Sequence, residues 1–328
     1  MKKLPSKQMV KTKPKVNGKV PLKIVQKAAA FSPLEILMPM GATELSQIVL
    51  PSPKKHWGDF IVSGRTGMIN APRGAGKSTF ILALSLSMAY RADFLGNKPT
   101  NPRRVVILDG EMDLHTMQGR LKEQTQALNV DIDDTQLKFV SPELFDGIMP
   151  NLSTVDGQRE IDKALGDQWD VLFIDNYSAF SESGREDGES WMPWIRWMLK
   201  HKRAGRTVIV IHHTGKNGQQ RGSSKHEDAL DFSIALKPVP DDKHDGSLRF
   251  IVEWKKSRHL PSDKTRPFVV NYVRTPEGYI WSRGEVADAN EKMVEAKRLR
   301  AEGMSQADIA AKMGVNKSTV SRWLSNKQ

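Results

Sequence analysis

Long apolar runs recur through the middle of the chain, and most of them end at a polar or charged residue. The segments 103–109, 171–176 and 206–211 each contain four consecutive apolar residues. Runs of this kind are typical of strands that are buried on both faces of a parallel sheet. Because stretches of helical character alternate with them, the pattern predicts an α/β fold with a mainly parallel sheet and helices on both faces.

Shorter elements are expected around these runs. A helix is expected within 43–49, another at 114–128 and a third from Trp191 onward, after a loop over 177–190. The tryptophans of the third helix either stack on nucleic-acid bases or, as their helical spacing favours, pack in the core or a subunit interface. The further strands are predicted at 137–140, 229–237, 247–255 and 265–273, with the core closing at 279–281.

Residues 289–328 change to a wholly helical pattern. One helix is expected at 290–302, a second begins with the capping-box-like Ser305–Asp308, and a third covers 317–324. The apolar positions Ile309, Met313, Val315, Val320 and Trp323, with the small Ala310 between the helices, fit a helix-turn-helix.

A helix-turn-helix places its last helix in the major groove of DNA. The residues expected to face phosphates and base edges are Lys317, Ser318, Thr319, Ser321 and Arg322. A small helical bundle for protein contacts is the alternative, and the basic, hydroxyl-rich face favours DNA.

The N-terminal residues 1–30 differ from both of these parts. They contain many lysines, scattered prolines and no acidic residue. A segment of this composition buries too little apolar surface to fold alone, so a disordered basic tail is expected. It serves either to grip nucleic acid or simply to keep the protein soluble. The predicted organisation is therefore a tail at 1–30, an α/β domain at 31–285 and a helix-turn-helix domain at 289–328.

Composition limits the kinds of binding partner and the cellular compartment that we expect for this protein. The formal net charge is +12 and the pI is about 9.7, which favours a polyanionic partner. The chain contains no cysteine, so disulfides and thiolate metal sites are excluded. No apolar run approaches the roughly 18–20 residues of a membrane span, and no signal-peptide pattern begins the chain. We expect a cytoplasmic protein without membrane contact.

The strongest motif lies between a short apolar strand and a helix, at 66–90. Ala71 to Ser78 nearly match the phosphate-binding loop G-x-x-x-x-G-K-[ST], with Ala71 in place of the first glycine. Lys77 is expected to reach the β- and γ-phosphates of ATP, and the Ser78 hydroxyl to ligate Mg²⁺. The residues expected to bind the nucleotide are Arg73, Gly74, Ala75, Gly76, Lys77, Ser78 and Thr79.

A second motif supports this site. The apolar run 171–174 ends in Asp175, as in a Walker B strand whose aspartate holds Mg²⁺. With a phosphate-binding loop earlier in the chain, the pair predicts ATP and Mg²⁺ as ligands.

The motifs follow one another in an order that is similar to that of a known family. GAGKST, ILDGEMD, VLFIDN, IVIHHTGK with RGSS after it, and WKKSRH occur in turn between Trp57 and Trp281. The series resembles RecA-like P-loop ATPases, and most closely the RepA-type hexameric plasmid helicases related to the DnaB type. The resemblance implies a RecA-like core, ATP hydrolysis and a homo-oligomeric ring, such as a hexamer. It covers neither the tail nor the C-terminal helices.

The resemblance also implies roles for single residues. Glu111 matches the carboxylate that polarises the attacking water, with Asp109 and Asp113 as nearby competitors. His213 matches a residue that senses the γ-phosphate. Lys77 completes the set of catalytic residues expected within one subunit.

Cationic residues further along are expected to act between subunits or on DNA. Lys256 and Arg258 match a Lys-x-Arg pair that reaches the nucleotide of a neighbouring subunit. Arg221 is either a further finger or part of the segment 214–222. That segment is the candidate for contacting single-stranded DNA in a central channel, with Lys216 and Arg221 on phosphates.

Three functions agree with these motifs. The favoured one is a DNA-dependent ATPase ring, a helicase or translocase of plasmid or phage replication tethered to duplex DNA. The second is a DNA-binding regulator or loader in which ATP acts as a switch and nothing is unwound. A P-loop kinase for small molecules is third, and the C-terminal module disfavours it.

Overall fold

The computed structural model describes residues 39–144, 147, 149–181, 188–214, 225–239, 247–286 and 289–325. The predicted basic tail and the candidate DNA contacts Lys216 and Arg221 lie outside these residues. By its internal contacts the chain divides into a unit Met1–Ser52 and a unit Pro53–Gln328.

The described part of the first unit holds one short helix. This is α2 (Ala42–Gln47), within the region where a helix was expected, and it buries none of its residues. It ends where Ile48 turns to extended backbone. Prolines at 51 and 53 keep the following residues out of a helix.

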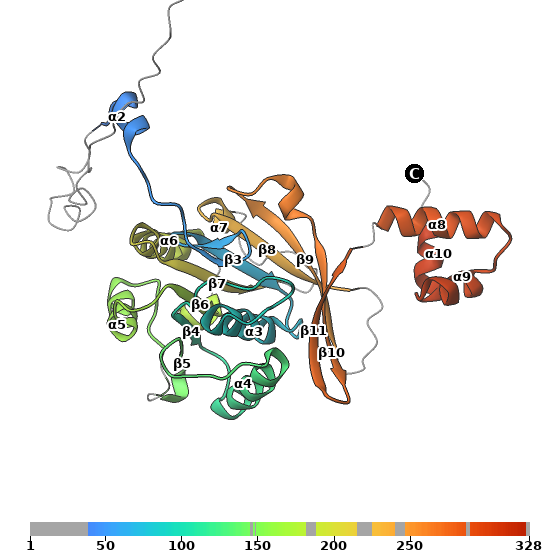
Figure 1. Ribbon diagram of the computed structural model, residues 1–328, viewed down its shortest axis with the longest axis horizontal. Helices are drawn as coiled ribbons and strands as arrows, with labels where there is room; N and C mark the ends of the chain where they lie inside the picture. The colour runs from blue at the N-terminus through green and yellow to red at the C-terminus, as the bar shows by residue number, and fades with distance from the viewer. Residues whose placement is uncertain are drawn as a thin grey trace, which may run out of the picture. The chain divides into compact units, whose positions relative to one another are not determined.

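The second unit is built on a nine-stranded sheet in the order β11-β10-β9-β8-β3-β7-β6-β4-β5 (Figure 1). The six strands from β8 to β5 in this order run parallel to one another. On the other side, β8 pairs with β9, β9 with β10 and β10 with β11, each pair antiparallel. Their bounds are β3 (Thr66–Ala71), β4 (Val105–Asp109), β5 (Leu137–Val140), β6 (Val171–Asp175), β7 (Thr207–His213), β8 (Phe232–Pro238), β9 (Leu248–Ser257), β10 (Phe268–Thr275) and β11 (Gly278–Glu285). A separate small ribbon pairs β1 (Lys55–Trp57) with β2 (Ile61–Val62).

Alternate residues of the central strands pack into two different apolar clusters. Ile69 and Phe173 join the cluster that includes α3 (Lys77–Tyr90). Met68 and Leu172 join the other, which includes α5 (Val155–Leu165) and α6 (Gly188–Arg203). Since successive side chains of a strand point to opposite faces, helices cover both faces of the sheet, as predicted.

Several elements differ from the prediction in detail. Helix α5 was not expected, and the tryptophan helix begins at Gly188 instead of Trp191. The predicted loop after Asp175 opens with a short 3₁₀ turn, Tyr177–Phe180, whose two end residues are buried. Strand β7 continues through both histidines to His213.

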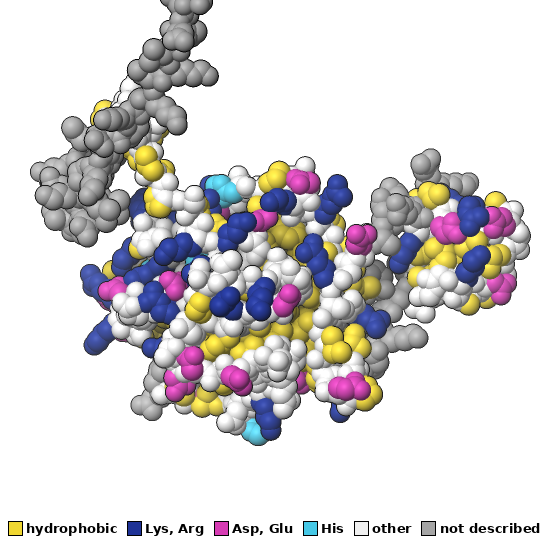
Figure 2. Space-filling model, in the orientation of Figure 1, with side chains coloured by type: hydrophobic (Ala, Val, Ile, Leu, Met, Phe, Trp, Pro, Cys, Tyr) yellow, Lys and Arg dark blue, Asp and Glu magenta, His cyan; other side chains and the backbone are white. Residues whose placement is uncertain are grey.

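The tryptophans of α6 belong to the core. Trp191, Trp194 and Trp197 are between 0 and 2% exposed, and Trp191 stacks on Trp194 at 5.9 Å between ring centroids. Base stacking by these residues is therefore excluded in this conformation. The other end of α6 is basic, with Lys200, Lys202 and Arg203 in its last turn, where cations favour the helix dipole. Lys and Arg side chains gather over the part of the surface where α6 lies (Figure 2).

The β10–β11 hairpin is fastened to α4 (Leu114–Leu128) through polar groups. The Gln124 side chain, fully buried, donates to the Tyr272 hydroxyl at 2.6 Å and accepts from the Trp281 indole at 2.8 Å. The Tyr272 hydroxyl donates to Glu123, and burial raises the pKa of this phenol. Helix α4 is thus held to the antiparallel side of the sheet.

The C-terminal helices have a core of their own. They are α8 (Ala289–Ala301), α9 (Gln306–Met313) and α10 (Lys317–Ser325), and their buried apolar residues are Ala296, Leu299, Ile309, Ala310 and Val320. Ser305 caps α9 by accepting from the Asp308 amide, and Gly314 ends it with φ 64°. The predicted set of three helices is confirmed, and the turn between the second and third begins at Gly314. None of the described helices is long and apolar enough to cross a membrane.

Candidate nucleotide-binding site

The turn between β3 and α3 has the backbone that a phosphate-binding loop requires. Gly74 and Gly76 have φ values of 77° and 79°, which favour glycine. A Cβ on Gly76 would also lie 2.8 Å from Leu248 Cδ1, so the Leu248 side chain would have to shift to admit it. Ala71 is the last residue of β3, and its carbonyl accepts from the Thr214 amide at 3.0 Å. Because Ala71 sits in regular strand, it does not need the freedom of the usual glycine.

A pocket of about 700 Å³ opens in front of this turn. It lies at the carboxyl ends of β3, β7, β6 and β4, the edge where open α/β sheets bind ligands. Ala71 is in register with His213, and Asp109 with Asp175. The residues that line the pocket are Arg73, Gly74, Gly76, Lys77, Ser78, Thr79, Glu111, Arg120, Asp175, His213 and Leu248.

Lys77 is held at the floor of the pocket. Its side chain is 5% exposed, and Nζ lies 3.0 Å from the Pro72 carbonyl oxygen and 2.9 Å from His213 Nδ1. Burial lowers the pKa of Lys77 and also that of His213, whose pKa the Lys77 charge lowers further. A phosphate group would supply the counter-charge that this buried ammonium needs.

Ser78 and Asp175 form a pair of oxygen ligands beside Lys77. The Ser78 hydroxyl donates to Asp175 Oδ2 at 2.8 Å, and Asp175 is 7% exposed. Burial raises the pKa of Asp175 to about 6. A hard cation such as Mg²⁺ prefers oxygen ligands and is held in nucleotide sites by one or two protein groups plus phosphates. The pair fits that role, although no three His, Cys, Asp or Glu side chains in the described segments form a metal site by themselves.

The structure separates the three acidic residues that follow β4. Asp109 is 4% exposed, and its Oδ1 accepts from the amides of Glu111 at 2.9 Å and Met112 at 2.7 Å. Asp113 is the N-cap of α4, accepting from the Thr116 amide at 2.8 Å. Only Glu111 directs its carboxylate to the pocket, where it is 54% exposed and 3.6 Å from His213 Nε2. Asp109 thus shapes the loop and Asp113 starts the helix, and of the three only Glu111 faces the pocket.

Two further residues of the site, Asn176 and Arg120, were not among the expected site residues. The Asn176 side chain lies 2.9 Å from His213 Nε2, so His213 is fixed through both ring nitrogens. Arg120 projects from the second turn of α4 into the pocket. Arg120 comes nine residues after Glu111 in the sequence. Its place in the pocket can be predicted only when the position of α4 is known.

Asp175→Asn is expected to stabilise the nucleotide-free protein at neutral pH by up to about 3 kcal/mol, because the amide has no charge to bury. With its pKa raised from 3.8 to about 6, folded Asp175 binds protons that the unfolded chain has lost in this window. The wild-type free energy of unfolding therefore falls as pH rises from about 4 to about 6, and the Asn variant lacks this fall. Urea denaturation across this range measures the difference. An advantage of equal size at every pH would contradict the assignment.

The expected trans residues Lys256 and Arg258 lie away from the pocket of their own chain. The Arg258 amide bonds the Asp231 carbonyl, and the Asp231 amide bonds the carbonyl of Thr66 at the start of β3. Lys256 Nζ donates to the carbonyls of Glu227 and Asp228 in α7 (Lys225–Asp228), and the Arg258 guanidinium also donates to Asp228. The structure therefore does not bring them together with Lys77 and Glu111 in one subunit.

The candidate DNA-reading residues of α10 differ in exposure. Lys317, Ser318 and Ser321 are exposed, whereas Thr319 is 7% exposed and faces the small core. The expectation that Thr319 contacts DNA is not met in this conformation, because it follows the turn at Asn316 and packs inward beside Val320. The side chain of Arg322 lies outside the described part.

Comparisons with known proteins match this geometry. A family model described as an AAA domain matches residues 33–219, more than half of the chain. The chain belongs to the AAA domain family. A second model, described as a homeodomain-like domain, matches residues 294–327. No curated protein matches the sequence.

Solved structures of similar fold include a KaiC-like protein, PH0186, from Pyrococcus horikoshii OT3 and the RadB recombinase. The first is 16% identical with a TM-score of 0.45, covering 67% of this chain and 90% of its own. The second is 12% identical with a TM-score of 0.44, covering 66% and 90%. The AAA domain here is a mostly parallel α/β domain, followed by a helical region that matches the homeodomain-like model. The predicted α/β class with a C-terminal helical domain is confirmed.

Proposed function

We propose that the chain is an ATP-hydrolysing motor that acts on DNA, working as a ring-forming helicase or translocase of plasmid or phage replication. The position of Glu111 carries the proposal. Its carboxylate is half exposed, faces the phosphate-binding turn and lies beside His213, while the neighbouring acids are occupied elsewhere. A pocket that only holds nucleotide has no need for a free carboxylate at this place.

The polar groups at the centre of the pocket would then each have a chemical task on ATP. The loop amides and Lys77 would bind the β- and γ-phosphates, and Ser78 with Asp175 would hold Mg²⁺. The ion would neutralise charge on the phosphates. Glu111 would orient and polarise the attacking water, which needs a base within reach of one hydrogen bond. His213, held by Lys77 and Asn176, would contact the γ-phosphate side.

The proposed ring explains why Lys256 and Arg258 are far from their own pocket. Cations that stabilise transferred phosphate can come from a neighbouring molecule. A homo-oligomer, in the hexameric form of the RepA and DnaB types that the motif order resembles, would bring them to the next subunit's nucleotide. Hydrolysis would then depend on assembly.

Two DNA contacts are part of the proposal. The segment 214–222, with Lys216 and Arg221, would bind single-stranded DNA in the channel, and α10 would bind duplex through Lys317, Ser318, Ser321 and Arg322. In this reading the ATPase domain is 31–285 and the DNA-reading domain 289–328. The net charge of +12 agrees with a polyanionic partner.

A second function, an ATP-switched regulator or loader, is favoured by one observation. The three C-terminal helices have a complete core of their own, so they can bind duplex without any motor activity. Nucleotide would then change only the affinity for DNA.

The deciding experiment measures ATP hydrolysis per subunit against protein concentration, with and without single-stranded DNA, beside mass photometry. The motor predicts a rate that rises as the oligomer assembles and rises again with DNA. A slow rate that is independent of concentration would favour the switch. Strand displacement, with Glu111→Gln as control, separates the two further: ATPase activity that DNA stimulates without any displacement would end the helicase assignment.

A further inference from the structure

The surface of α6 presents a row of cations that the nucleotide site does not use. Arg196, Lys200 and Arg203 are exposed, and because they follow one another after four and three residues they lie on one face of the helix. The row extends about 10 Å along the helix axis. The opposite face of α6 is apolar, and its Trp194 and Met198 are buried in the cluster that covers the sheet.

Other cations at this end of α6 fix the helix in place. Lys202 Nζ donates to both carboxylate oxygens of Asp231, at 2.6 and 2.7 Å. Arg206, just after the helix, donates to Asp167 at 2.7 Å and lies over the Trp169 ring, 4.7 Å from its centroid. These contacts hold the last turn of α6 and therefore the position of the row.

The cations of the row itself remain accessible to a ligand. Among the described residues, neither the Arg196 nor the Arg203 side chain has an ion-pair or hydrogen-bond partner. Lys200 pairs with Asp162 at 2.6 Å but is still 67% exposed. The helix dipole explains why cations are favoured in the last turn, but Arg196 lies about two turns before the end of α6.

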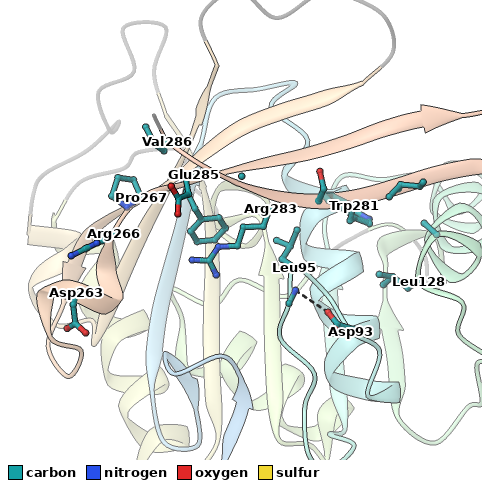
Figure 3. Close-up of a pocket in the computed structure, with 16 residues that line it drawn as sticks. Asp93, Leu95, Leu128, Asp263, Arg266, Pro267, Trp281, Arg283, Glu285 and Val286 are labelled. Atoms are coloured by element: carbon teal, nitrogen blue, oxygen red, sulfur yellow. Dashed lines mark hydrogen bonds between the residues drawn. The ribbon is translucent and has the colours of Figure 1, made fainter. Parts of the chain in front are cut away.

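This part of the sequence also lacks acidic residues. After Glu189 the next acidic residue is Glu227, and eight Lys and Arg residues lie between them. A surface that only has to be solvated usually mixes both signs of charge, as a groove of about 1180 Å³ near β11 does (Figure 3). Two arginines and three acids are among the residues that line this groove: Arg266, Arg283, Asp93, Asp263 and Glu285. The single sign of charge on α6 therefore indicates a polyanionic partner (Figure 2).

We propose that the α6 row, Arg196, Lys200 and Arg203, binds the phosphate backbone of duplex DNA without reading its sequence. Each strand of a duplex carries one phosphate per about 3.4 Å of helix axis, so a row about 10 Å long can follow about three phosphates. Single strands are usually bound with aromatic side chains on which their bases stack. The tryptophans of α6 are buried and provide no such surface, so a duplex, whose bases stack on one another, fits better.

This surface is additional to the two DNA contacts of the proposed function. It rests on that function only in taking DNA as the polyanion. Because backbone contacts fix position but carry no sequence information, the row would hold duplex DNA while α10 reads it.

Arg196→Gln with Arg203→Gln tests this surface in the full-length chain. Glutamine has nearly the helix propensity of arginine, so α6 should still fold. Fluorescence anisotropy with a short duplex of arbitrary sequence, repeated over a range of salt concentrations, measures the affinity and its salt dependence. We expect the glutamine pair to bind about tenfold more weakly, and the slope of log affinity against log salt to fall by about two.

The matched control is Arg266→Gln with Arg274→Gln, which removes the same charge from two exposed positions at and before β10. This control is expected to bind the duplex within about twofold of wild type, since it leaves every phosphate contact in place. Arg196→Lys with Arg203→Lys retains the charge and should bind with nearly the wild-type affinity and salt slope. Equal losses in the glutamine pair and the control would overturn the proposal. An unchanged salt slope, or a lysine pair as weak as the glutamine pair, would do the same.

Two further outcomes would assign the row to a different occupant and overturn the proposal. In the first, the glutamine pair loses as much affinity for a single strand of the same length as for the duplex. In the second, it keeps its DNA affinity but loses oligomers in mass photometry, which would make the row an interface between copies of the chain.

These outcomes differ from a failure of the proposed function, because DNA binding is measured without ATP. Suppose that DNA does not stimulate ATP hydrolysis but the glutamine pair still binds duplex more weakly. The motor would then be rejected and the α6 contact kept. DNA-stimulated hydrolysis together with unchanged duplex binding by the glutamine pair would reject only the α6 contact.

Discussion

Glu111→Gln is expected to lower the turnover number for ATP by about 10²–10⁴-fold while ATP affinity stays within a few fold of wild type. The amide has the shape of the carboxylate but cannot accept a proton from water. Affinity is retained because Lys77, the loop amides and Ser78 are unchanged. Single-turnover hydrolysis and equilibrium binding of a fluorescent ATP analogue measure the two quantities separately.

The matched control is Asp113→Asn, two residues away. Asparagine is as good an N-cap as aspartate, so α4 keeps its start while one negative charge near the site is lost. The control is expected to hydrolyse ATP at close to the wild-type rate. If both variants lose activity equally, local charge and not the Glu111 carboxylate is responsible. A Glu111→Gln protein with full activity would remove this residue from the mechanism.

Arg258→Ala is expected to lower hydrolysis by about 10³-fold or more in the assembled protein, which is the effect typical of a cation supplied by a neighbouring molecule. Its guanidinium contacts only main chain of α7 among the described residues, so ATP binding by the single subunit should persist. Lys255→Ala is the control, since Lys255 is a half-exposed lysine of β9, three residues before Arg258, and is paired with Glu253 at 2.8 Å. It should keep its activity.

Mixing the two inactive proteins tests whether the site is shared. In assemblies of Glu111→Gln and Arg258→Ala subunits, some interfaces combine an intact Glu111 with an intact Arg258 of the neighbour. Activity should therefore reappear on mixing and reach a maximum near equal amounts. Mixtures that stay inactive, although subunits exchange, would place Arg258 within its own subunit and withdraw its role between copies.

The central strands could be predicted from the sequence because burial on both faces leaves a continuous apolar run. Helix α5 could not, since only Gly157 and Ile161 of its residues are buried and most of its other positions are polar or charged. Its place is decided by tertiary contacts, such as the hydrogen bond that the Gln158 side chain donates to the Pro193 carbonyl of α6 at 3.2 Å. The start of α6 was misplaced because its first turn has no apolar residue before Trp191.

The part of the candidate site that consists of local sequence motifs could also be predicted. The phosphate-binding turn and Asp175 are local motifs, and the structure places them in one pocket. The structure was needed to distinguish Asp109, Glu111 and Asp113. The distinction depends on which carboxylates accept hydrogen bonds from the loop amides and from the first turn of α4. Leu248 reaches the site from β9, and no local spacing in the sequence predicts that contact. Asn176 directly follows Asp175, but its contact with His213 depends on how β6 and β7 pair.

The contact between Lys77 and His213 has a consequence for communication between ligands. Phosphate and His213 Nδ1 compete for the same ammonium group. His213 ends β7 and directly precedes the segment that contains Lys216 and Arg221. If nucleotide changes how strongly that segment holds DNA, linkage requires DNA to change nucleotide affinity by the same factor. The exchange of Lys77 between His213 and phosphate would then couple the two affinities, so that DNA affinity reports on bound nucleotide and nucleotide affinity on bound DNA.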